Sequence, residues 1–119
     1  MAWKRLCAAG AVAEDSIKRF DVDGVPVVLV SFGDEYRAMP PMCPHEEEPL
    51  EESGVCAAGV LTCAEHLWQW SLADGKPAGP EENDRNLLLY PVRREGDDLM
   101  VQIDSELTYQ YDKDDEFDF

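Results

Sequence analysis

The stretch PMCPHEEEPL, residues 41–50, places Cys43 and His45 on either side of a single proline. A second stretch, TCAEHLWQW, repeats this combination with Cys63 and His66. Prolines disfavour helix for the chain that enters the first pair, so that pair is predicted to lie on a loop that follows a strand. Two such loops, placed side by side, would offer two sulfur and two nitrogen ligands.

Two kinds of metal centre use that ligand set. Zinc binds two Cys and two His tetrahedrally, but zinc-finger patterns keep the cysteines together and the histidines together. A Rieske [2Fe–2S] centre has two Cys on one iron and two His on the other. Because each loop here carries one of each, the mixed pairs favour the iron–sulfur centre. A zinc-stabilised binding module remains the alternative.

Composition bounds the other possibilities. The chain has 119 residues and a formal net charge of −16, which suits a single domain. An acidic surface repels phosphate backbones and anionic lipids, so nucleic-acid and membrane roles are not expected. No apolar run approaches the roughly 20 residues that span a bilayer. A cytoplasmic protein with reduced thiols is expected, and Cys7 and Cys56 are predicted to be buried, unreactive thiols.

Short apolar runs alternate with turn signals along the chain. The run VPVVLVSF at 25–32 is almost wholly apolar, which predicts a strand covered on both faces. Further strands are predicted at 3–7, 17–22, 36–39, 54–62, 67–72, 87–92 and 99–103, with a proline-containing loop at 76–80. The pattern predicts an all-β fold, an antiparallel β-barrel or sandwich. Residues 104–119 are predicted to form an acidic tail.

Little else in the chain suggests catalysis. Both histidines belong to the candidate metal site, which leaves none for a hydrolytic triad. The strand–helix–strand pattern of a dinucleotide fingerprint is absent. The protein is therefore expected to be an electron carrier and not an enzyme, and to receive its electrons from another protein.

These motifs resemble a known family. The CPH and CAEH motifs, separated by seventeen residues, are similar to the signature of Rieske ferredoxins. The sequences MCPH, GVLTCAEHLWQW, YPV at 90–92 and GDDLMV at 96–101 resemble the ferredoxin component of bacterial multicomponent diiron monooxygenases, which oxidise toluene and alkenes. The resemblance covers residues 3–103.

The resemblance implies a Rieske fold over residues 1–103. This fold has an antiparallel barrel-like base and a small cluster-binding subdomain of two ligand loops, here at about residues 40–80. Each loop would give a cysteine to the inner iron and a histidine to the outer, exposed iron of one [2Fe–2S] cluster. The implied ligands are Cys43, His45, Cys63 and His66.

The resemblance also implies a function and partners. The protein would carry one electron at a time, as a monomer, from an NADH-dependent flavoprotein reductase to a terminal diiron monooxygenase of hydrocarbon catabolism. Two alternatives stay open within the same chemistry. The partner could be a ring-hydroxylating dioxygenase, or the chain could be a small Rieske subunit of a nitrite-reductase-type enzyme.

The residues around the ligands predict a low reduction potential. High-potential Rieske proteins carry a disulfide between the ligand loops and a serine after the second histidine, whereas Glu48, Glu65 and Leu67 stand in those places here. Fewer interactions would then stabilise the reduced, more negative cluster. The glutamates at 46, 47, 48, 51 and 52 act in the same direction, and they are candidates for docking a basic partner.

Overall fold

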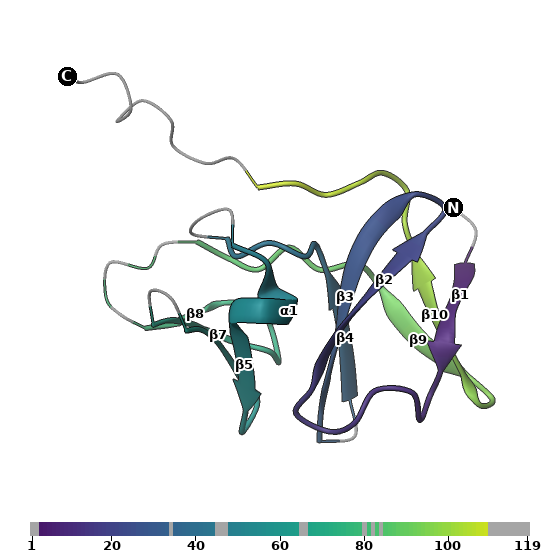
Figure 1. Ribbon diagram of the computed structural model, residues 1–119, viewed down its shortest axis with the longest axis horizontal. Coiled ribbons are helices and arrows are strands. Elements are labelled where there is room, and N and C mark those ends of the chain that lie inside the picture. Colours follow the sequence, from purple (N-terminus) through teal and green to yellow (C-terminus); the bar gives the residue numbers. More distant parts are fainter. Residues whose placement is uncertain are drawn as a thin grey trace.

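The computed structural model describes residues 3–33, 35–44, 48–64, 67–79, 81, 83 and 85–109. Within these residues the chain forms ten strands and one helical turn, arranged in three antiparallel sheets (Figure 1). Two three-stranded sheets form a base, and a four-stranded sheet stands beside them. The predicted all-β fold is confirmed, and no described helix has the length and apolar character needed to cross a membrane.

The base is built from both ends of the described chain. Its strands are β1 (Trp3–Ala8), β2 (Ile17–Val22), β3 (Val25–Phe32), β4 (Glu35–Met39), β9 (Val92–Glu95) and β10 (Asp98–Gln102). One sheet has the order β1-β10-β9 and the other β2-β3-β4. Asp23 and Gly24 join β2 to β3 with φ of 52° and 86°, the left-handed values of a tight hairpin turn.

β3 separates two hydrophobic cores. Its residues from Val27 to Val30 have no exposed surface. Val27 and Leu29 belong to a core shared with β1 and β10, whereas Val28 and Val30 belong to a second core shared with the four-stranded sheet. Alternate side chains of a strand point to opposite faces, so a single strand supplies both cores. The predicted coverage of this strand on both faces is confirmed.

The four-stranded sheet follows the helical turn α1 (Leu50–Ser53). Its strands are β5 (Gly54–Ala57), β6 (Val60–Cys63), β7 (Trp68–Ser71) and β8 (Pro77–Gly79), in the order β5-β6-β7-β8. The single strand predicted at 54–62 is wrong, because Ala58 and Gly59 form a two-residue turn with φ of 53° and 77°. Alanine rarely adopts this conformation, so the sequence carries only half of the usual turn signal.

The loop predicted at 76–80 contains the short strand β8. Its Pro77 pairs with Trp70, and its Gly79 pairs with Gln69. β8 lies at the edge of the sheet, where proline is tolerated because its missing N–H is not required by a second neighbour. The proline-rich composition therefore concealed a real strand.

The strand predicted just before β9 is wrong for all but its last residue. Tyr90 makes only an isolated bridge, and its N–H donates to the Ala38 carbonyl of β4 at 2.8 Å. Leu87 N–H donates to the Gly75 carbonyl of the β7–β8 turn, also at 2.8 Å. Residues 85–91 are called the connecting segment here, because they bond first to the four-stranded sheet and then to the base.

Residues 104–109, the C-terminal segment, lie against the connecting segment. Tyr90 Oη accepts the N–H of Leu107 at 2.8 Å, and Tyr109 Oη accepts the N–H of Leu88 at 3.0 Å. The segment runs from β10 back across the molecule towards the four-stranded sheet (Figure 1). The remainder of the predicted tail lies outside the described residues.

Candidate metal centre

The first ligand loop closes on itself between β4 and α1. Met42 and Pro49 form an isolated antiparallel bridge, and Cys43 N–H donates to the Glu48 carbonyl at 2.9 Å. These contacts bring the two described ends of the loop, residues 42–43 and 48–49, together. Pro44, the next residue, is fully buried. The loop thus holds Cys43 by backbone bonds on one side and by packing on the other.

The second ligand loop begins at the last residue of β6. Leu67 N–H donates to the Cys63 carbonyl at 2.6 Å, and Leu67 has a left-handed φ of 60°. Cys63 pairs with Gly54 of β5 on one side and with Trp68 of β7 on the other. A Cβ atom at Gly54 would lie 2.6 Å from the Leu50 carbonyl oxygen, so glycine is required opposite Cys63.

Ser53, at the end of α1, joins the two loops. Its hydroxyl donates to Glu48 Oε2 of the first loop at 2.9 Å. Its carbonyl accepts the N–H of Ala64, which follows Cys63, at 2.7 Å. One residue is therefore bonded to both loops. The sequence reading missed Ser53, and the only signal was its place between the two motifs.

The structure brings the two candidate cysteine ligands into one core. Cys43 and Cys63 are both 0% exposed and belong to the core cluster that also contains Trp70 and Leu72. No disulfide is formed within the described residues, which include all four cysteines. Two buried thiols at the ends of adjoining loops fit the inner, cysteine-bound iron of a two-iron cluster.

The candidate histidine ligands lie outside the described residues. His45 directly follows Pro44, and His66 directly precedes Leu67, both of which are described. Glu65, which is predicted to replace a loop cysteine, also lies outside the described residues. Within the described residues, no three or more His, Cys, Asp or Glu side chains are grouped as a metal site would need. The predicted site has two of its four ligands, His45 and His66, outside these residues. The ligand assignment as a whole stays a prediction.

The other two cysteines are buried, as predicted. Cys7 is 6% exposed and Cys56 is 5% exposed. Desolvation by burial raises the pKa of both thiols, and the pKa of Cys56 reaches about 11. A thiol is nucleophilic mainly as its thiolate, so both are poorly reactive at neutral pH.

Comparison with known proteins gives the family. A model of the Rieske [2Fe-2S] domain matches residues 2–102. The ferredoxin subunit of methanesulfonate monooxygenase from Methylosulfonomonas methylovora is 43% identical over 99% of this chain and 94% of that protein. The ferredoxin component of the alkene monooxygenase system of Xanthobacter autotrophicus is 30% identical over 81% of this chain and 77% of that protein.

A solved structure agrees with the fold. The ferredoxin of carbazole 1,9a-dioxygenase from Nocardioides aromaticivorans IC177 has a TM-score of 0.73 and 25% identity, over 85% of this chain and 97% of that one. The chain belongs to the Rieske [2Fe–2S] domain family. Its cofactor is a Rieske-type [2Fe–2S] cluster, and it is an electron-carrying ferredoxin of an oxygenase system rather than an enzyme. The predicted cofactor, fold and carrier role are confirmed.

Proposed function

We propose that this ferredoxin passes single electrons from an NADH-dependent flavoprotein reductase to a terminal monooxygenase. The observation that carries the proposal is the pair of buried cysteines, Cys43 and Cys63, at the ends of two loops joined by Ser53. A bound Rieske cluster supplies reversible one-electron reduction. The chain's own part is to hold the cluster between those loops, with His45 and His66 completing its ligands.

The relatives support a monooxygenase over a dioxygenase as electron acceptor. Both curated relatives described above are named as parts of monooxygenase systems, whereas two biphenyl dioxygenase ferredoxins are 27% and 28% identical to this chain. The resemblance to toluene and alkene systems predicts a diiron centre and a hydrocarbon substrate. The identity to the methanesulfonate subunit supports a small sulfonate as a second candidate substrate.

The remaining assignments follow from charge and from the shuttle role. A carrier must release each partner, so we propose a monomer that docks briefly and weakly. The chain has 26 acidic and 10 basic residues, which favours partners with basic docking surfaces. We propose a cytoplasmic location, where the flavoprotein reductase would find NADH.

Reconstitution with purified partners tests this function. The ferredoxin is mixed with NADH, a flavoprotein ferredoxin reductase and, in turn, the terminal oxygenase of a methanesulfonate, an alkene or a biphenyl system. Substrate-dependent oxygen uptake should be fastest with one of the two monooxygenases, and it should fall as salt screens docking. Uptake with the biphenyl dioxygenase alone would overturn the choice of acceptor. No cluster reduction by any reductase would overturn the carrier role.

A further inference from the structure

The guanidinium of Arg37 bridges the base and the four-stranded sheet. Arg37 lies on β4, and its side chain is 23% exposed. Its Nε donates to the Leu72 carbonyl at 2.8 Å, and its Nη2 donates to the Ala73 carbonyl at 3.3 Å. Both carbonyls belong to the turn that follows β7. Arg37, a residue of the base, thus binds the backbone at the end of β7 in the four-stranded sheet.

The rest of the guanidinium is held by the base. Nη1 donates to the Tyr36 carbonyl at 2.9 Å, Nη2 donates to Glu35 Oε1 at 2.9 Å, and the group lies 5.0 Å from the ring centre of Phe32. Charged, planar donors of this kind have little freedom once several acceptors fix their plane. The side chain is therefore a rigid link and not a flexible surface cation.

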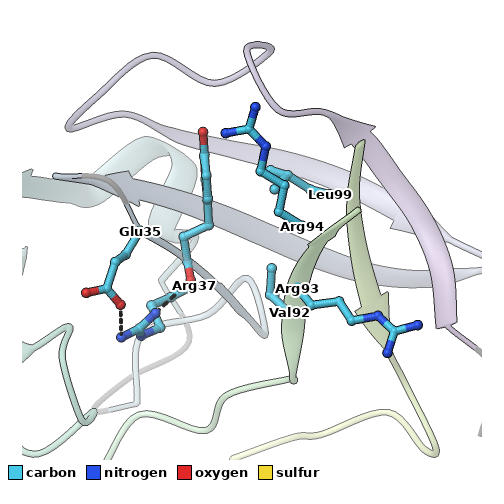
Figure 2. A pocket seen from close by; sticks show the side chains of 7 residues that line it. Glu35, Arg37, Val92, Arg93, Arg94 and Leu99 are labelled. Atoms are coloured by element: carbon cyan, nitrogen blue, oxygen red, sulfur yellow. Dashed lines mark hydrogen bonds and ion pairs between the residues drawn. The ribbon is translucent and has the colours of Figure 1, made fainter. Parts of the chain in front are cut away.

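Arg37 lines a pocket of about 210 Å³, which is drawn in Figure 2. Glu35 and Arg37 form one side of the pocket, and Arg93 and Arg94 come from β9 on the other. Arg94 contacts only its own hairpin, through the Gly96 carbonyl at 2.9 Å and Asp97 at 3.9 Å, among the contacts of the described residues. Arg94 therefore carries the same charge without reaching the four-stranded sheet.

The backbone that Arg37 binds is close in structure to the candidate ligands. The Leu72 side chain is 0% exposed and packs in the same core as Cys43 and Cys63. Leu72 N–H also donates to the Gly59 carbonyl at 2.9 Å, which ties the end of β7 to the β5–β6 turn. A shift of the backbone at Leu72 would therefore be transmitted into the core that holds both sulfur atoms.

We propose that Arg37 is a positioning residue for electron transfer, which fixes the four-stranded sheet on the base and thereby sets the orientation of the cluster edge. The proposal rests on the proposed function, because it takes Cys63 at the end of β6 as a ligand. Arg37 acts through hydrogen-bond geometry rather than through its charge. Lysine at this position keeps the charge but loses the planar fork, so it cannot replace arginine.

Three variants of the full-length, cluster-loaded protein test the proposal: R37K, R37M and the control R94M. In the reduced state, R37K and R37M should both show broader electron paramagnetic resonance lines, because the cluster geometry becomes less uniform. Both should transfer electrons to the oxygenase about tenfold more slowly at saturating partner, because reacting groups held out of their productive geometry react more slowly. R94M should match the wild type in linewidth and in rate at saturation.

The outcomes distinguish a role of the hydrogen-bond geometry of Arg37 from a role of its charge, and both from failure of the proposed function. If R37K matches the wild type, charge and not the fork is what matters, and the proposal is overturned. If both Arg37 variants match R94M in linewidth and in rate, Arg37 has no positioning role. If R37M does not fold, R37K decides alone, with E35Q as a milder change that keeps both carbonyl bonds and should leave the linewidth unaltered. A wild-type protein without a Rieske signal would instead overturn the ligand assignment.

Discussion

Single residues around the two candidate cysteines explain why the loops take their shape. Leu67 has φ of 60° and is 70% exposed, so its strained backbone is not offset by burial of its side chain. A left-handed conformation costs a non-glycine residue roughly 1–2 kcal/mol. The tight turn that its N–H closes onto Cys63 is therefore kept against a local preference, as is common at functional sites.

Two buried cysteines of the same core offer a matched test of the ligand assignment. Cys63→Ala should abolish the visible absorbance and the reduced-state paramagnetic signal, because an alanine cannot replace a thiolate ligand. Cys56→Ala removes a thiol from the same core and should keep both signals, at a cost of about 1 kcal/mol in the free energy of unfolding. Spectra of the purified proteins and urea denaturation measure the two effects.

The opposite pattern would contradict the assignment. A Cys63→Ala protein that retains a Rieske signal would remove Cys63 from the ligands. Loss of the signal in Cys56→Ala, with the protein still folded, would mean that Cys56 takes part in the site. The spacing of the motifs predicts Cys63 as a ligand, but it could not reveal Ser53 or Gly54, whose roles depend on how the loops meet in space.

Elements were predictable from the sequence to the extent that their signals are local. β3 was identified by its continuous apolar run, and the structure explains that run by the two cores on its faces. The β5–β6 hairpin was missed because Ala58 takes a conformation that its side chain disfavours. β8 was missed because a strand at a sheet edge can contain proline. In both segments, pairing with the neighbouring strand outweighed the local conformational preference.

The C-terminal segment gives a prediction at the scale of elements. Tyr109→Phe removes the oxygen that accepts the N–H of Leu88, and this should cost about 1–2 kcal/mol, since the amide loses its partner. Amide hydrogen exchange at Leu88 should become faster. Tyr36→Phe is the control, because it removes a phenolic hydroxyl group that donates to the Ala9 carbonyl within the base.

The control should lower stability without changing exchange at Leu88. Unchanged exchange at Leu88 in Tyr109→Phe would show that the C-terminal segment does not brace the connecting segment. The sequence indicated an acidic tail from residue 104, and its aromatic residues were the one sign that part of it packs. Which tyrosine meets which amide could not be read from the sequence, because the partners are about twenty residues apart.

The charge of the whole molecule is unevenly distributed. Between residues 41 and 89 the sequence has ten acidic and two basic residues, whereas lysine and arginine are concentrated in the strands of the base. If the predicted ligands hold the cluster, reduction adds an electron to this acidic half. The negative side chains of this half repel the added electron and so lower the reduction potential, and dissolved salt screens this repulsion.

Voltammetry at low and high ionic strength tests this consequence. The midpoint potential should be low, below that of respiratory-chain Rieske proteins, and it should rise as salt is added. Charge-neutralising variants outside this half, such as Asp21→Asn on β2, should move the potential less than Glu52→Gln on α1. A strongly positive midpoint, or one that does not respond to salt, would contradict the role assigned to the glutamates.

Burial of Cys43 and Cys63 also bears on how the protein is made. If Cys43 and Cys63 are the ligands, a protein that delivers iron and sulfide must reach both sulfur atoms, which are 0% exposed in the folded chain. We therefore expect cluster insertion to precede closure of the two loops. Folding would then cover the cysteine-bound iron. We accordingly expect the yield of active carrier to depend on the supply of clusters during folding, since filling an already folded chain would require the loops to open.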